Sequence, residues 1–346
     1  MTDHGTSSSA PLRSAHVSRG RAVVSLLLVM GAMLAATAMP AGAARPWWWR
    51  TTTTTKAPTT TTTAAPPTST TAPSTTTTAP TTTTTTTVPG DPCGGVSIPK
   101  ATGGTWTCSF SDEFDGSALD RTKWLPQQTA TSNYTSGAEC FVDDPDNIAV
   151  AGGSLRLTVR KETAPMSCGK VSNTMYTGGM VSTHTKFSQA FGRFEFRAKF
   201  ANVKVKGLQG AIWLWPDNPL KYGAWPYSGE IDVAEVYSLY ADRAIPFLHY
   251  ATYSTKVTNN YCLIDTTQFH TYLLEWTTTG IRISFDGKVC VDDPITPLSP
   301  LLSPQPFDHP FMVALTQGLG VTGNAFDPAV TPLPGTMEVD YVRVWK

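Results

Sequence analysis

Residues 192–200 read GRFEFRAKF, and this stretch decides the fold. Phe194, Phe196, Ala198 and Phe200 alternate with charged side chains, so the apolar residues recur with a period of two. Successive side chains of a β-strand point to opposite faces of the sheet. The alternation therefore predicts a strand with one face buried and the other face in water.

The same pattern extends outward from this strand, starting at about residue 104. Further runs with strand character cover residues 155–159, 272–276, 281–285, 311–316 and 337–345. Asp286-Gly287 follows one of these runs and predicts a tight hairpin, because both residues accept a positive φ. No stretch of twelve or more residues shows a helical stripe.

An all-β domain of this size has to cover the apolar face of each sheet. Two antiparallel sheets that pack face to face achieve this. We therefore expect a two-sheet antiparallel β-sandwich of jelly-roll type. A curved sandwich has a concave groove, which suits a polymeric substrate.

The first 90 residues have a different composition. Residues 22–44 carry no charge and follow an arginine-bearing start, which predicts a signal peptide over residues 1–43. The same run is long enough to remain in a bilayer as a signal anchor, so cleavage and retention both stay open. Residues 44–90 are rich in Thr and Pro, with 24 Thr among residues 51–90. They predict a disordered stalk, glycosylated or bare, that could tether the protein to a membrane or cell wall.

Residues 91–346 form the expected folded domain, and their charge limits the class of partner. The chain has 26 basic and 26 acidic side chains, of which six basic and one acidic lie in residues 1–90. The folded part therefore has 20 basic and 25 acidic side chains, a net charge of −5, without a cluster of Lys and Arg. Nucleic acid is an unfavourable partner for such a domain.

All six cysteines follow the stalk. An even number of cysteines in an exported chain predicts three disulfides, for which fifteen pairings exist. We favour closure of near neighbours, because each bridge would then close a hairpin or loop: Cys93 with Cys108, Cys140 with Cys168, and Cys262 with Cys290. No CxxC pair is present, which argues against a zinc site.

Residues 222–237, YGAWPYSGEIDVAEVY, carry three acids at Glu230, Asp232 and Glu235. Glu230 and Asp232 share a strand face, whereas Glu235 would point into the core unless a β-bulge near Val233 adds one residue. With the bulge, all three carboxyl groups face the groove. Two carboxyl groups about 5 to 5.5 Å apart suit a double displacement at a glycosidic carbon. The alternative is a solvated strand face with incidental acids.

At this point the sequence resembles glycoside hydrolase family 16, and within it the bacterial laminarinase-like endo-β-1,3-glucanases. The resemblance covers roughly residues 104–346 and is most specific where WPxSG precedes ExDxxE. It is carried by SDEF at 111–114, LD at 119–120, KW at 123–124, GRFE at 192–195, YG at 222–223, WP at 225–226, SGEID at 228–232, Glu235, LHY at 248–250, FHTY at 269–272, EW at 275–276, DG at 286–287 and VDYVRV at 339–344.

The resemblance implies a concanavalin-like sandwich and a role for each acid. Glu230 matches the nucleophile, Asp232 its auxiliary residue and Glu235 the general acid/base. His249 matches a histidine that faces the acids from the adjacent strand, although a structural role is equally compatible.

Aromatic residues near the acids are candidates for stacking on sugar rings. Trp213 and Trp215 lie two apart on one strand face, and Trp225 precedes Glu230 by five residues. Core packing is the competing interpretation for all three tryptophans.

The family resemblance also implies a structural calcium ion on the convex side. The matching ligands are the side chains of Glu113 and Asp340 and the carbonyl oxygen of Gly153, and oxygen ligands suit calcium. These acids could instead be ordinary residues of terminal strands. Catalysis in this family needs no cofactor.

Two segments depart from the family pattern. MVALTQGLGVTGNAFDP follows Phe311 in place of the usual NxAVGGxWPG run, and GLQGAIWLWP replaces the common GLWPAFWML. Both differences leave the choice of polysaccharide open.

The resulting hypothesis is a secreted, monomeric, retaining endo-glycosidase that hydrolyses β-1,3-linked or mixed-linkage glucan. A non-catalytic glucan-binding or wall-binding module is one alternative. A relative that acts on galactan, or that transfers sugar to sugar instead of water, is another.

Overall fold

The computed structural model describes residues 92–346 apart from residues 96 and 102. The predicted signal peptide over residues 1–43 and the predicted stalk over residues 44–90 lie outside the described residues. Within the described part, no helix is long and apolar enough to cross a membrane.

The described part is built almost entirely from β-strands, as the period-two pattern predicts. A short helix, α2 (Thr129–Ser132), and two single turns of 3-10 helix, Ser238–Tyr240 and Thr322–Asn324, interrupt the strands. The strands are β1 (Cys108–Asp112), β2 (Leu125–Pro126), β3 (Cys140–Phe141), β4 (Ile148–Val150), β5 (Leu155–Cys168), β6 (Val171–Ser182), β7 (Gly192–Lys199), β8 (Leu208–Pro216), β9 (Glu230–Tyr237), β10 (Ile245–His249), β11 (His270–Thr277), β12 (Gly280–Phe285), β13 (Lys288–Asp293), β14 (Phe311–Leu319) and β15 (Gly335–Trp345).

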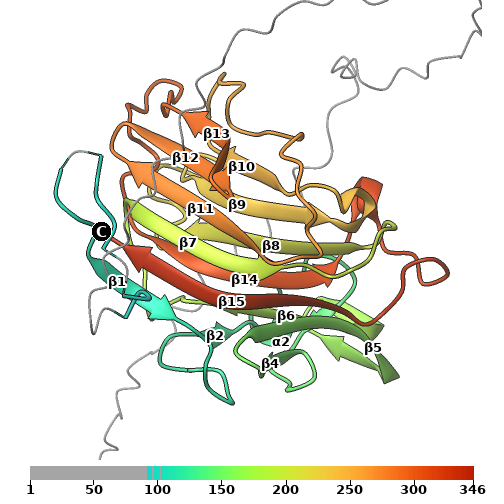
Figure 1. Cartoon of the computed structure of the whole chain (residues 1–346). Helices are drawn as coiled ribbons and strands as arrows, with labels where there is room; N and C mark the ends of the chain where they lie inside the picture. The colour runs from blue at the N-terminus through green and yellow to red at the C-terminus, as the bar shows by residue number, and fades with distance from the viewer. Residues whose placement is uncertain (1–91, 96, 102) are drawn as a thin grey trace, which may run out of the picture.

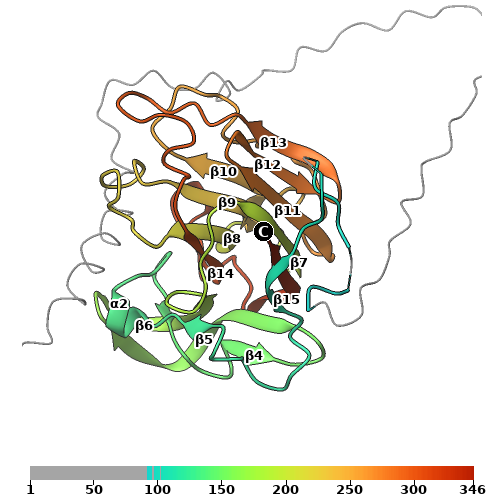
Figure 2. The same ribbon diagram turned by 90° about the vertical axis from the view of Figure 1, so that its left-hand side faces the viewer.

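The strands form a β-sandwich (Figures 1 and 2). One layer has the order β10-β9-β8-β14-β6, and the other has the order β5-β15-β7-β11-β12-β13. The long strands β5 and β6 pair with each other and join the two layers at one side. All of these pairs along the two layers are antiparallel, as expected for a jelly roll.

The core lies between the two layers, and its residues are the apolar ones of the alternating pattern. In β7, Phe194, Phe196 and Ala198 are fully buried, whereas the charged residues between them are only partly buried. The opposite layer contributes Ile212 and Leu214 from β8 to the same core cluster. Each fully buried Phe or Leu contributes about 1.5–3 kcal/mol relative to an exposed side chain.

The turn between β12 and β13 has the predicted form. Asp286 and Gly287 both have positive φ, at 47° and 80°, and connect Phe285 to Lys288. Such a turn matches the twist of the flanking strands and fixes their register.

The structure confirms the pairing of near-neighbour cysteines. The disulfides join Cys93 to Cys108, Cys140 to Cys168, and Cys262 to Cys290. Each bridge closes a loop of 15 or 28 residues, and closure of a loop of this length removes about 3 kcal/mol of chain entropy from the unfolded state.

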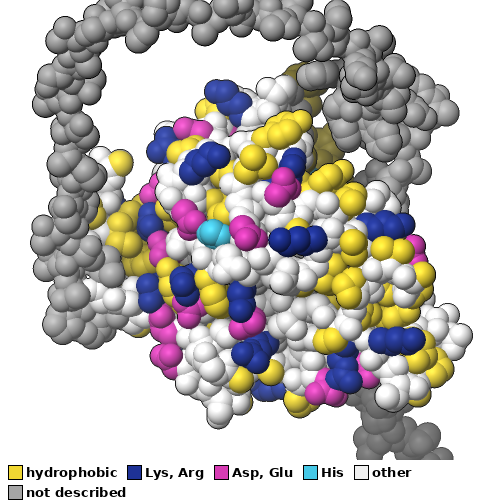
Figure 3. All heavy atoms as spheres, turned by 45° about the vertical axis from the view of Figure 1, so that its right-hand side comes forward, with side chains coloured by type: hydrophobic (Ala, Val, Ile, Leu, Met, Phe, Trp, Pro, Cys, Tyr) yellow, Lys and Arg dark blue, Asp and Glu magenta, His cyan; other side chains and the backbone are white. Residues whose placement is uncertain are grey.

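The described surface mixes charges of both signs. On the face in Figure 3, Lys and Arg side chains lie among Asp and Glu side chains, without a patch of a single sign. Charged side chains also form pairs on the outer face of the layer that contains β7 and β15, such as Arg193 with Glu195 and Lys199 with Glu338. The exposed pairs of this layer, such as Arg282 with Asp292, contribute little to stability.

Candidate active site

The three acids of β9 lie on one face because the strand contains the expected β-bulge. Between β8 and β9, Ile212 pairs with Ala234 and Trp213 pairs with Asp232, so Val233 is the extra residue. Val233 and Ala234 both belong to the core cluster. The bulge therefore turns Glu235 to the outer face of the sheet, together with Glu230 and Asp232.

Glu230 lies at the start of β9 and is 7% exposed. The indole Nε1–H of Trp225 donates a hydrogen bond of 2.7 Å to Oε2 of Glu230. Trp225 comes from the loop between β8 and β9, so this contact fixes the loop to the acid. Because an indole can only donate, the bond favours the ionised form of Glu230.

Asp232 lies between the two glutamates and pairs with His249 of β10. Its Oδ2 is 2.9 Å from Nε2 of His249, and its side chain is almost completely buried. His249 stands opposite Glu230 in the strand register. Its ring stacks on Phe247 at 4.1 Å between ring centroids and lies 5.3 Å from the ring of Trp225, so it is held on two sides.

Glu235 is the most accessible of the three acids. Two donors reach its Oε1: the hydroxyl of Tyr237 at 2.8 Å and the amide Nε2 of Gln209 at 2.9 Å. Gln209 lies on β8 and Tyr237 lies on β9, so side chains from two adjacent strands converge on this carboxyl group.

Burial raises the pKa of all three acids. Desolvation raises the pKa of Glu230 and that of Asp232, and repulsion between the two adds to the effect on Glu230. Carboxyl oxygens of Glu230 and Asp232 lie within 4.8 Å of each other. Two buried carboxyl groups at this distance retain one proton between them. Desolvation raises the pKa of Glu235 to about 7, with a further contribution from Asp232, while Tyr237, His249 and Gln209 counteract the rise.

Known proteins share this fold and this chain's sequence pattern. The family model of glycosyl hydrolases family 16 matches residues 135–294. A beta-glucanase of Rhodothermus marinus is 30% identical over 274 residues, which covers 70% of this chain and 85% of that protein. The chain belongs to glycosyl hydrolase family 16.

Two further relatives are longer than this chain's matching region. A glucan endo-1,3-beta-glucosidase of Niallia circulans is 29% identical over 68% of this chain, and a keratan-sulfate endo-1,4-beta-galactosidase of Sphingobacterium multivorum is 30% identical over 68%. The chain spans 37% and 54% of their lengths. The X-ray structure of the laminarinase from Rhodothermus marinus is 29% identical, with a TM-score of 0.59 over 70% of this chain and 97% of that chain.

The tryptophans of this family 16 chain differ in accessibility. Trp213 and Trp215 lie on the face that bears the acids but are each only 3% exposed, and Trp213 donates to Oγ1 of Thr316 at 3.0 Å. They pack beneath the site and offer little ring surface. Trp225 is partly buried and keeps one edge on Glu230.

Sequence reasoning missed Tyr134, Gln209 and Tyr237. Tyr134 follows α2 and packs against Phe141 and Trp213. Burial raises its pKa, and the nearby charges of the three acids and of Glu139 add to the rise. Tyr237 continues the face of Glu235 with a period of two, which was a usable signal. No signal in the sequence indicated Tyr134, because a separate loop brings it to the acids.

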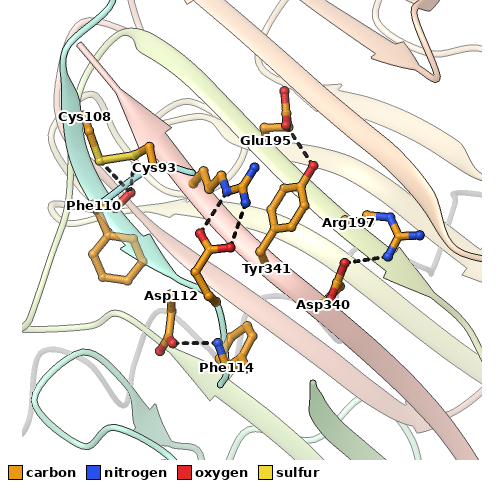
Figure 4. Close-up of polar contacts among 11 residues, drawn as sticks. Cys93, Cys108, Phe110, Asp112, Phe114, Glu195, Arg197, Asp340 and Tyr341 are labelled. Atoms are coloured by element: carbon orange, nitrogen blue, oxygen red, sulfur yellow. Dashed lines mark hydrogen bonds and ion pairs between the residues drawn. A yellow bond between two sulfur atoms is a disulfide. The ribbon is translucent and has the colours of Figure 1, made fainter. Parts of the chain in front are cut away.

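The residues proposed for calcium have other partners. Glu113 forms a bidentate ion pair with Arg343, at 2.8 and 2.7 Å, and Asp340 pairs with Arg197 (Figure 4). Gly153 lies in the turn between β4 and β5. The carboxylates that would bind the ion are both paired with guanidinium groups, so this arrangement does not fit calcium.

Among the described residues, Glu230, Asp232 and His249 bring three possible ligand atoms within 4.8 Å of one another. One polar atom of each is already engaged: Asp232 Oδ2 with His249 Nε2, and Glu230 Oε2 with Trp225. These contacts leave fewer ligand atoms for a metal ion at this group.

Proposed function

We propose that this chain is a secreted, retaining endo-glycosidase that hydrolyses β-1,3-linked or mixed-linkage glucan by double displacement. The observation that carries the proposal is the bulge at Val233, which puts Glu230, Asp232 and Glu235 on one face. The glucan substrate is supported by the glucanase relatives, and export is supported by the three disulfides.

In the first step, Glu230 attacks the anomeric carbon and Glu235 gives its proton to the departing glycosidic oxygen. The hydrogen bond from Trp225 stabilises the ionised form of Glu230. The proton that the buried pair retains then resides on Asp232, next to His249. The carbon–oxygen bond to the leaving sugar breaks as the bond to Glu230 forms.

In the second step, the ionised Glu235 takes a proton from water, and the resulting hydroxide attacks the anomeric carbon and releases Glu230. A pKa of about 7 suits a group that has to act first as acid and then as base near neutral pH. Two inversions give a product with the original anomeric configuration.

The test is hydrolysis of laminarin by the purified full chain and by Glu230→Gln. We expect the variant to lose at least about a thousandfold in kcat/KM, because the amide cannot form the glycosyl-enzyme. Glu275→Gln, in which the acid lies on the outer face of the opposite layer beside Arg193, is the matched control. Unchanged turnover by Glu230→Gln, or an inverted first product by NMR, would refute the proposal.

The keratan-sulfate endo-1,4-beta-galactosidase relative gives a reason to test a second polymer. A panel of laminarin, mixed-linkage glucan and galactans, analysed for new reducing ends and for longer transfer products, distinguishes hydrolysis of glucan from hydrolysis of galactan and from transglycosylation. Binding of laminarin without new reducing ends from the wild type would indicate a non-catalytic binding module instead.

A further inference from the structure

We propose that Gln209 and Tyr237 are positioning residues for the acid/base: together they hold Oε1 of Glu235 and leave Oε2 to carry the transferred proton. This inference rests on the proposed function, because it assigns a role to Glu235 in proton transfer. It adds two residues that are not part of the acid triad.

The strand register places both donors on the same oxygen. Gln209 pairs with Tyr237 in the β8–β9 ladder. Ala211 pairs with Glu235 two residues further along, so the side chains of both pairs lie on the same face. The small side chain of Ala211 leaves room for Glu235 to lean toward the Gln209–Tyr237 pair. The bulge at Val233 is a requirement for this arrangement, because it turns both Glu235 and Tyr237 to the outer face.

The two bonds make the carboxyl oxygens of Glu235 different. Oε1 accepts from the Tyr237 hydroxyl at 2.8 Å and from the Gln209 amide at 2.9 Å. A carboxyl oxygen that accepts two hydrogen bonds is a poor site for a proton. Among the described residues, no hydrogen bond reaches Oε2. The neutral acid therefore carries its proton on Oε2, and the ionised base keeps a fixed orientation when it accepts one from water.

The donors also oppose the negative charges around Glu235. Glu230 and Asp232 on β9 repel its ionised form whenever they are themselves ionised. The ring of Tyr134 lies near the same charges, whereas His249 on β10 favours the ionised form. Gln209 and Tyr237 stabilise the ionised form through their hydrogen bonds. Removal of either donor should make Glu235 a weaker acid and leave its carboxyl group held by one hydrogen bond instead of two.

The experiment compares Tyr237→Phe and Gln209→Met with the wild-type full chain over a pH series. Two substrates are used: laminarin, whose leaving sugar needs protonation, and a laminari-oligosaccharide with a dinitrophenyl leaving group, which does not. We expect the alkaline limb of kcat/KM for laminarin to move up by about 0.5 pH unit or more in each variant. We also expect a loss of about tenfold on laminarin and at most about twofold on the aryl substrate.

Tyr341→Phe is the matched control. The Tyr341 hydroxyl donates to Oε1 of Glu195 at 2.9 Å in the other layer, so this variant removes the same type of bond far from the proposed chemistry (Figure 4). It should leave the pH profile and the ratio of the two substrates as in the wild type.

An alkaline limb and a substrate ratio that stay at wild-type values in both variants would overturn the positioning role. If one variant does not fold, the pH profile and substrate ratio of the other variant still test the positioning role. A ¹³C NMR titration of the Glu235 carboxyl carbon provides a second readout, and an unchanged pKa in a folded variant would also overturn the proposal. A failure of the proposed function itself would be seen separately: if Glu235 were not the acid/base, Glu235→Gln would hydrolyse laminarin as fast as the wild type.

Discussion

At the scale of single residues, the environment of each acid decides its role more than the acid itself. Glu230 has a donor-only partner in Trp225, Asp232 has a titratable partner in His249, and Glu235 has two neutral donors. Three acids within six residues therefore have three different electrostatic environments, which is the condition for the separate roles that we propose for them.

Replacement of Trp225 tests the first of these environments. Trp225→Phe keeps an aromatic ring but removes the N–H donor from Glu230, so the pKa of Glu230 should rise further and less of the nucleophile is ionised. We expect kcat/KM on laminarin to fall about 10- to 100-fold, with the acid limb of the pH profile displaced upward. Trp106→Phe, at a residue that contacts Lys100 outside the site, is the control. An acid limb at its wild-type position would contradict the role of the indole donor.

The raised pKa of Glu235 also makes a prediction about stability. Its pKa is about 7 in the folded chain, whereas an unperturbed glutamate has a pKa of 4.5, so the folded chain holds the proton more tightly between these values. Ionisation of Glu235 therefore costs nothing below pH 4.5, and its cost grows until about pH 7.

We expect Glu235→Gln to be more stable than the wild type by about 2 kcal/mol at pH 8, a value reduced for the partial exposure of the side chain. At pH 4 the difference should almost disappear. Urea unfolding at both pH values measures this, with Glu275→Gln as the control. Equal stability of Glu235→Gln and wild type at pH 8 would contradict the raised pKa.

At the scale of elements, the position of Glu230 depends on the residue that precedes β9 as well as on the bulge within β9. Gly229 precedes Glu230 with φ at +82°, and a Cβ there would lie 3.0 Å from Phe307 and 3.1 Å from Phe311. Both the backbone conformation and the contact with two core rings favour glycine at this position. The position of Glu230 therefore depends on the packing of the core beneath it.

Gly229→Ala tests this dependence, and Gly287→Ala is a matched control. Gly287 has nearly the same φ, at +80°, but nothing lies within 4 Å of its hypothetical Cβ. We expect Gly287→Ala to cost about 1 kcal/mol with normal activity, and Gly229→Ala to cost about 2–4 kcal/mol and to lower kcat. Calorimetry and laminarin turnover give both numbers. Similar losses in the two variants would mean that the positive φ alone accounts for the loss of stability, and that the contact with Phe307 and Phe311 does not contribute.

The strands and the bulge were predictable from sequence because both follow from periodicity. The alternation around Phe194 requires a half-buried strand, and the distance from Glu230 to Glu235 requires an extra residue if both are to share a face. The contacts of Tyr134 and Gln209, and the arginines that pair with Glu113 and Asp340, were not predictable. They depend on which strands and loops lie side by side, and residue spacing within one segment does not contain that information.

At the scale of the whole molecule, the charge distribution bears on the choice of polymer. The part after residue 90 carries five more acidic than basic side chains, and three of the acids line the site. A neutral glucan approaches such a surface without an electrostatic cost, whereas a polyanion is repelled until salt screens the charges. The −5 charge therefore favours uncharged polysaccharides over sulfated or carboxylated ones.

Salt dependence tests this preference. Between about 20 and 500 mM NaCl, we expect kcat/KM on laminarin to change by less than about twofold, and that on carboxymethylated β-1,3-glucan to rise several-fold, because the Debye length falls from roughly 20 Å to about 4 Å over this range. The neutral polymer serves as the control for general effects of salt on the enzyme. A rate on the anionic polymer that falls with salt would show that a local basic surface guides the substrate and that net charge does not govern the choice.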